Sequence, residues 1–171
     1  MTNTQNVVGL TPLTLKNLTS AIDKSIQGLS SSGSNSKTII LADGLDFLLA
    51  YEPTITSTDI QRLILDLQAR VHGVVVTCAA DEALLHNTEP SATPLEMEHA
   101  TMARSLAHGS SWVFQLRPLE TGQSKEVSGS VRVSRGGAWD DLEDGKDLEE
   151  GEWLYHVQSD GGVRVWGRGE A

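Results

Sequence analysis

The spacing of apolar residues along the chain predicts three amphipathic helices. The first, near 12–27, has apolar residues at intervals of three and four, namely Leu15, Leu18, Ile22, Ile26 and Leu29. In the second, near 58–71, the stripe consists of Ile60, Leu63, Ile64, Leu67 and Val71. The third, near 94–107, has a partial stripe of Leu95, Met102 and Leu106. We expect each stripe to face a hydrophobic core.

Residues that begin and end helices flank these stripes. Thr11-Pro12 and Thr93-Pro94 each place a capping hydroxyl before a proline at the first helical position. Three consecutive residues are candidates for the cap of the second helix: Ser57, Thr58 and Asp59. The pair His108-Gly109 predicts the end of the third helix.

Two kinds of strand pattern follow the helical stripes. Continuous apolar runs at 38–42 and 74–79 are typical of strands buried on both faces. The segment "WVFQL" at 112–116 is the next strand, and we predict that all three are parallel central strands. After residue 126 the pattern changes to an alternation of period two, at 127–134, 152–157 and 163–167. The turn signal "QSDGG" joins the last two of these segments into a hairpin. Helix–strand units followed by antiparallel strands predict an α/β fold.

The chain shows no internal repeat and no clear domain boundary. We therefore predict a flexible N-terminus over 1–10 and a single domain over 11–171, with an acidic loop at about 138–151. Residues 140–152, "DDLEDGKDLEEGE", hold eight acids and one lysine, a net charge of -7 out of -10 for the whole chain. Such a run is typical of a solvated loop, and the alternative is a docking patch for a basic partner.

Composition narrows the class of protein. The 171 residues are 39% hydrophobic and 21% charged, and no apolar run approaches the roughly 18–20 residues of a membrane helix. The single cysteine excludes an internal disulfide, and the first residues do not form a signal peptide. We expect a cytoplasmic or nuclear protein with no membrane association. The net charge of -10 argues against a free-standing nucleic-acid binder.

Two features of "SNSKTIILADG" suggest nucleotide binding. A phosphate loop must follow a strand and open a helix, whereas Lys37-Thr38 precedes a predicted strand, and the string G-x-x-x-x-G-K-[ST] is absent. Asp43 lies at the carboxyl end of that strand, where nucleotide hydrolases hold magnesium. Without a phosphate cradle, Asp43 is either a vestigial strand-end acid or part of an Asp43-Gly44 turn.

Other reactive residue types form no catalytic set. Cys78 lies among apolar residues and is typical of a small core side chain, and the five histidines have no metal-ligand spacing. We therefore expect no catalytic residues, no cofactor, no metal and no enzymatic activity. In "SVRVSRGGAW", Arg132 and Arg135 are candidates for contact with a partner carboxylate or an RNA phosphate. Trp139 is a candidate for covering a partner surface. The alternatives are a solvated strand face for the arginines and a core or edge position for the tryptophan.

Four segments in order carry a family resemblance: "TIILADGLDFLLA", "VHGVVVTCAADEALL", "WVFQLRPLETGQSKEVSGSVRVSRGG" and "YHVQSDGGVRVWGRG". Together they resemble fungal Elongator complex protein 6, over about residues 7–168. The resemblance implies a RecA-like three-layer sandwich without a working phosphate loop. It also implies assembly with Elongator complex proteins 4 and 5 into a hetero-hexameric ring that contacts tRNA and supports its wobble-uridine modification. A standalone α/β adaptor or regulatory module unrelated to tRNA is the alternative.

One difference from the family pattern concerns the N-terminus. Family members carry a further strand–helix–strand unit before the matched region, where this chain has "MTNTQNVVGL". We therefore expect the sheet to lack strands of the family core and to expose an edge.

Overall fold

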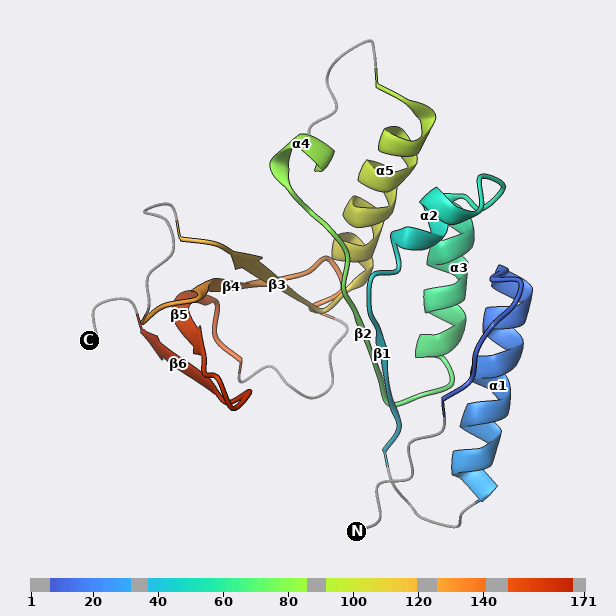
Figure 1. Ribbon diagram of the computed structural model, residues 1–171, viewed down its shortest axis with the longest axis horizontal. Coiled ribbons are helices and arrows are strands. Elements are labelled where there is room, and N and C mark those ends of the chain that lie inside the picture. Colours follow the sequence, from blue (N-terminus) through green and yellow to red (C-terminus); the bar gives the residue numbers. More distant parts are fainter. Residues whose placement is uncertain (1–6, 32–36, 86–91, 120–125, 141–147, 168–171) are drawn as a thin grey trace. The chain divides into compact units, whose positions relative to one another are not determined.

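The computed structural model describes residues 7–31, 37–85, 92–119, 126–140 and 148–167 (Figure 1). Its contacts divide the chain into two compact units, residues 1–104 and 105–171. The division describes how contacts are distributed, and the single domain over 11–171 stays a prediction. Part of the predicted flexible N-terminus, residues 1–6, and part of the predicted acidic loop, residues 141–147, lie outside the described residues.

The fold is mixed α/β, as predicted. The first unit contains α1 (Leu15–Ser31), β1 (Ile39–Ala42), α2 (Phe47–Tyr51), α3 (Ser57–Gln68), β2 (Gly73–Val76), α4 (Glu82–Leu85) and most of α5 (Pro94–Gly109). The second contains β3 (Trp112–Arg117), β4 (Gly129–Arg135), β5 (Gly151–Val157) and β6 (Val163–Gly167). The short helices α2 and α4 were not predicted, because each is too brief to show a periodic stripe.

The strands of the first unit form a parallel pair, connected through α2 and α3. Ile39 is paired with Gly73, and the register continues to Ala42 and Val76. Successive side chains of a strand point to opposite faces, and here Ile39, Leu41 and Val75 share one face. They are 64%, 68% and 50% exposed, respectively. The prediction that both strands are buried on both faces is therefore wrong, because these three side chains of one face are half or more exposed among the described residues.

Helix α3 provides the main core of the first unit. The prediction is confirmed for four residues of the stripe, since Ile60, Leu63, Ile64 and Leu67 are all buried. The fifth, Val71, lies beyond the end of the helix and is half-buried. Leu48 and Leu49 of α2, and Met102 of α5, are buried as well. The helix α1 lies beside α3 (Figure 1), and Arg70 joins the two through Asp23 at 2.5 Å and Asp66 at 2.7 Å.

The helix caps confirm one prediction and correct two. Helix α5 begins at Pro94 as predicted, with Thr93 and Glu96 in reciprocal hydrogen bonds, and it ends at Gly109. The cap of α3 is Thr56 and not Ser57, Thr58 or Asp59, because Thr56 and Asp59 form a complete capping box. Helix α1 begins at Leu15 and not at Pro12. The Asn17 N–H donates to Thr14 Oγ1 at 3.2 Å, so Thr14 supplies the capping hydroxyl in place of Thr11.

The second unit contains a four-stranded antiparallel sheet in the order β3-β4-β5-β6. The antiparallel C-terminal strands were predicted, and the hairpin of β5 and β6 is confirmed. The prediction that 112–116 is a parallel central strand is wrong, because β3 is an antiparallel edge strand paired with β4. Its run "WVFQL" has Trp112, Phe114 and Leu116 on one face, and Val113 and Gln115 on the other.

The predicted strand at 74–79 also ends early, at Val76. The backbone beyond it turns toward the loop after β1, because the Leu45 N–H donates to the Thr77 carbonyl at 3.3 Å. Gly44 likewise donates its N–H to Thr77 Oγ1 at 3.0 Å. The apolar composition of 74–79 could not show that the chain leaves the strand at Thr77 and contacts the loop after β1 instead.

The core of α3 gives a matched pair of substitutions. Leu67 is 1% exposed and Leu65, on the same helix, is 54% exposed. We expect Leu67→Ala to lower the free energy of unfolding by about 2–5 kcal/mol, because it leaves a cavity in the core. Leu65→Ala should change it by roughly 0.5 kcal/mol or less. Chemical denaturation followed by circular dichroism measures both, and equal effects would show that α3 is not packed as described.

Glu98 of α5 makes stability depend on pH. The Ser57 N–H donates to Glu98 Oε2 at 2.6 Å, and this hydrogen bond lowers the pKa of Glu98 below its ordinary value of 4.5. A carboxyl with a lowered pKa in the folded protein stabilises it above pH 4.5, and that stabilisation is lost as pH falls through the folded pKa. Denaturation midpoints of the wild type should therefore fall more steeply below pH 4.5 than those of Glu98→Gln. Parallel profiles would contradict this role.

Candidate functional site

The carboxyl end of the parallel pair holds the strand-end acid Asp43. The Thr77 hydroxyl donates to Asp43 Oδ1 and accepts the Gly44 N–H. Gly44 has φ +63°, a left-handed conformation that glycine adopts readily. Asp43 is thus part of a hydrogen-bonded turn, which is the arrangement expected for the Asp43-Gly44 turn alternative.

The two features that suggested nucleotide binding are not brought together. Lys37 precedes β1 and Asp43 follows it, so a strand of four residues separates them. At about 3.3 Å per residue this strand is roughly 13 Å long. A lysine at the far end of the strand could not bind the phosphate of a nucleotide whose magnesium Asp43 held.

A buried histidine beside an aspartate was not predicted. His99 of α5 is 8% exposed, and its Nε2 lies 3.6 Å from Asp46 Oδ2. Within the described residues neither ring nitrogen has a hydrogen-bond partner. The sequence contained a usable signal, because His99 lies between Leu95 and Met102 at spacings of four and three on the partial stripe of this helix.

Cys78 lies in the same unit and is half-buried. Burial raises the pKa of its thiol, and the negative charge of Asp46 raises it further. The thiol therefore stays protonated at neutral pH and is a weak nucleophile. In the part of the chain that the structure describes, no three residues of the types His, Cys, Asp and Glu are grouped to hold a metal ion.

Arg135 and Trp139 come together in the second unit. The Arg135 guanidinium carbon lies 3.9 Å from the centroid of the Trp139 ring, and Arg135 Nε lies 3.7 Å from Glu150 Oε2. Trp139 in turn meets Trp112 edge to face, with ring centroids 6.4 Å apart. This cation–π contact and edge-to-face pair hold Arg135 against its own chain.

Arg132 does not belong to that cluster. It lies three residues from Arg135 on the same strand, and an odd separation puts the two side chains on opposite faces of the sheet. Arg132 is exposed and has Gln115 and Glu152 as its cross-strand neighbours. The three candidate interface residues therefore do not form one surface, although a role in an interface stays a prediction for each.

Gly136 and Gly137 allow the cluster to form. A Cβ on Gly136 would lie 2.0 Å from the Ser110 carbonyl oxygen, and one on Gly137 would lie 2.4 Å from the His108 carbonyl oxygen. Three hydrogen bonds join the same two segments: Gly136 N–H to Ser111 O, Gly137 N–H to Ala107 O and Ala138 N–H to Ser110 O. The glycines are thus required for close approach of two backbones.

The four-stranded sheet has one largely apolar face, here called the apolar face. By strand alternation and register it consists of Trp112, Phe114, Leu116, Val131, Val133, Trp153, Tyr155, Val157, Val163 and Val165. Val133, near its middle, is buried, whereas Leu116 on one edge strand is 67% exposed and Val163 on the other is 60% exposed. Arg135, at one end of this face, is the residue held over Trp139.

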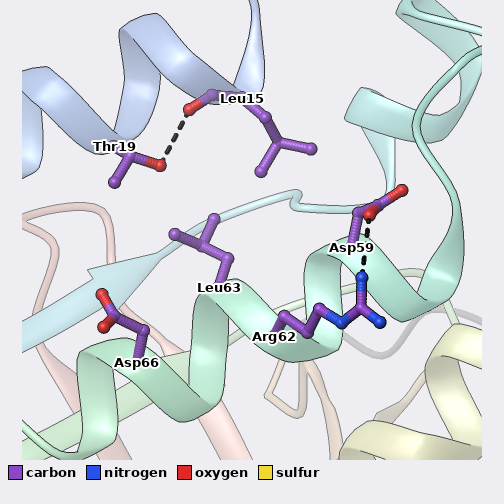
Figure 2. Close-up of a pocket in the computed structure, with 6 residues that line it drawn as sticks. All are labelled: Leu15, Thr19, Asp59, Arg62, Leu63 and Asp66. Carbon is purple, nitrogen blue, oxygen red and sulfur yellow. Dashed lines mark hydrogen bonds and ion pairs between the residues drawn. The ribbon is translucent and has the colours of Figure 1, made fainter.

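A shallow groove of about 320 Å³ lies between α1 and α3 (Figure 2). Its polar groups are engaged locally. The Thr19 hydroxyl donates to the Leu15 carbonyl at 2.8 Å, and Arg62 lies 3.9 Å from Asp59, which also belongs to the capping box of α3. These contacts are those of a junction between two helices, and they place no reactive group in the groove.

Comparisons with known proteins leave the family open. No family model matches the chain, and no curated protein matches it. Among the residues that the structure describes, no helix combines the length and apolar character needed to cross a membrane. The resemblance to Elongator complex protein 6 therefore stays a hypothesis.

The glycine contact generates a test. We expect Gly136→Ala to destabilise the protein by about 1–3 kcal/mol, because its methyl group would meet a main-chain oxygen that cannot move alone. Gly109→Ala is the control, since a Cβ there meets nothing within 4 Å. Thermal unfolding followed by tryptophan fluorescence compares the two, and equal stability would contradict the close approach.

Proposed function

We propose that this chain is a non-catalytic structural subunit of the Elongator complex. In this proposal it forms a hetero-hexameric ring with Elongator complex proteins 4 and 5 and so supports tRNA wobble-uridine modification in the cytoplasm or nucleus. The family resemblance supplies the partners, and tRNA is contacted through the assembled ring. The proposed fold is RecA-like, a three-layer sandwich whose layers are completed in the assembly.

The apolar face of the four-stranded sheet is the observation that carries this proposal. Phe114 and Leu116 on one edge strand, and Val163 and Val165 on the other, are each more than half exposed. Exposed apolar residues at both edges of a sheet are typical of surfaces that bind another protein. A subunit of a permanent complex is expected to expose such a face when its partners are absent.

The parallel pair supports the same proposal. Parallel sheets are normally covered on both faces, yet Ile39, Leu41 and Val75 expose one face here. The pair is also only two strands wide among the described residues. Two strands alone are marginally stable, so the pair gains from cover by another chain.

The absence of catalysis is also part of the proposal. Asp43 is hydrogen-bonded into a turn, and the Cys78 thiol has a raised pKa, so neither is prepared for chemistry. Neither group meets a base positioned to activate it among the contacts described above. We expect the purified chain neither to bind ATP tightly nor to hydrolyse it.

Charge on the apolar face tests the assembly. Leu116→Asp should prevent formation of a complex with Elongator complex proteins 4 and 5, because a carboxylate would be buried without a partner. Gln115→Asp, the neighbouring residue on the opposite face, is the matched control and should assemble as the wild type does. Co-expression followed by size-exclusion chromatography with light scattering measures the mass of each complex.

The same experiment separates the proposal from its alternative. A wild-type chain that stays monomeric beside both proteins would favour a standalone α/β adaptor or regulatory module. Normal assembly of Leu116→Asp would remove the apolar face from the interface without removing the subunit. Deleting the gene should lower wobble-uridine modification of tRNA, and unchanged modification would overturn the functional proposal.

A further inference from the structure

Strand β6 forms one edge of the four-stranded sheet, and among the described residues no strand pairs with its outer side. The Tyr155 carbonyl accepts the Ser128 N–H at 2.8 Å, so the main chain of Tyr155 faces away from β6. Tyr155 is the register partner of Val165. Because hydrogen-bonded and non-hydrogen-bonded pairs alternate along antiparallel strands, the N–H and C=O groups of Val165, and of Val163 two residues before it, point to the outer side.

This edge has few of the features that keep sheet edges from pairing. Natural edges are usually protected by proline, by a bulge or by several charges. Strand β6 contains no proline and one charged residue, Arg164, and its register with β5 continues over all of its residues without a bulge. Val163 and Val165 are 60% and 57% exposed. Such an edge is typical of a strand that pairs with a strand of another chain.

The sequence of β6 is complementary to itself when two copies run antiparallel. If Val165 lies opposite Val165 of a second copy, the outward main-chain groups of the two valines meet and exchange both N–H···O hydrogen bonds. Arg164 then lies opposite Trp166 of the second copy, and Trp166 lies opposite Arg164 of the second copy. Every side chain keeps its face in this arrangement, so the apolar face continues from one copy into the other.

The arginine and tryptophan pairs favour this register over its neighbour. Each is a non-hydrogen-bonded pair, in which Cα atoms lie about 4.5 Å apart and side chains come closest. Tryptophan is the best ring for a cation–π contact, and arginine is its commonest cation. Arg164 is exposed and Trp166 is half-buried, so both keep accessible surface for the contact. A register with Val163 opposite Val165 would instead set Arg164 against Arg164, and like charges directly opposite are destabilising.

From this complementarity we infer that β6 pairs antiparallel with β6 of a second copy of this chain. The two sheets then form one continuous sheet, with four strands from each copy. The pairing is twofold and uses the same surface in both copies, so it closes at a dimer. The inference concerns the edge of the sheet and does not rest on the proposed function, which concerns its apolar face.

The test uses the purified full chain alone, with mass measured by size-exclusion chromatography with light scattering over a range of concentrations. We expect the wild type to form a dimer whose fraction rises with concentration. Trp166→Arg should weaken the dimer about tenfold or more, because it sets two arginines opposite each other in both pairs. Adding Arg164→Trp to that variant should restore the dimer, because each arginine then faces a tryptophan again.

Val165→Asp and Val157→Asp are a matched pair of variants. The two valines belong to the same face and are 57% and 49% exposed, but only Val165 lies on the edge strand. Val165→Asp should weaken the dimer about tenfold or more, because two carboxylates would lie opposite each other. Val157→Asp adds the same charge on the inner strand and should stay within about twofold of the wild type.

Three results would overturn the inference. They are a wild type that stays monomeric at every concentration, equal weakening by the two aspartate variants, and an exchange of Arg164 and Trp166 that dimerises no better than Trp166→Arg alone. Because no Elongator protein is present in these measurements, failure of the dimer and failure of the proposed assembly are separate results.

Discussion

The alternation of side chains along a β-strand assigns every residue of the four-stranded sheet to one of two surfaces. In this sheet one surface is largely apolar, with Arg135 at one end, whereas the other mixes charged residues with Val113 and Leu154. Phe114, Leu116 and the valines of β6 face one way, and Arg117, Arg132 and Arg164 face the other. On the apolar surface the register pairs apolar residues across neighbouring strands, as in Phe114 with Val133 and Tyr155 with Val165. The proposed assembly depends on the largely apolar surface.

The same constraint explains why the parallel pair differs from its prediction. A strand of continuous apolar residues was interpreted as buried on both faces, which is the usual situation in parallel sheets. Composition shows that a face is apolar, but it does not show what covers it. Ile39 and Leu41 have the residue types of a buried strand, and yet they are exposed in the described structure. The helical stripe of α3 was more predictable. In an amphipathic helix the polar residues mark the face in solvent, so the apolar residues indicate the face that is covered.

The candidate sites were only partly predictable for a similar reason. Asp43 could be placed at the end of a strand from the local sequence, and Gly44 could be assigned to a turn. The contact of Thr77 with both residues joins positions more than thirty residues apart, and no local pattern predicts it. Arg132 and Arg135 were considered together because they are close in sequence. Counting their separation of three along a strand would already have placed them on opposite faces, whereas the ring beneath Arg135 required the structure.

The backbone contact at Gly136 and Gly137 restricts the residue types of only one of the two segments that it joins. The acceptors on the other segment, which includes the end of α5, are main-chain carbonyls, and any residue supplies one. Ala107, Ser110 and Ser111 could therefore be exchanged for other residues without losing these hydrogen bonds. At Gly136 and Gly137 the contact requires the absence of a side chain, because a Cβ at either position would overlap main-chain atoms of the other segment. Over evolutionary time the helix end can therefore drift in sequence while the two glycines cannot. We therefore expect the "GG" that follows β4 to vary less among related sequences than most of the residues around it.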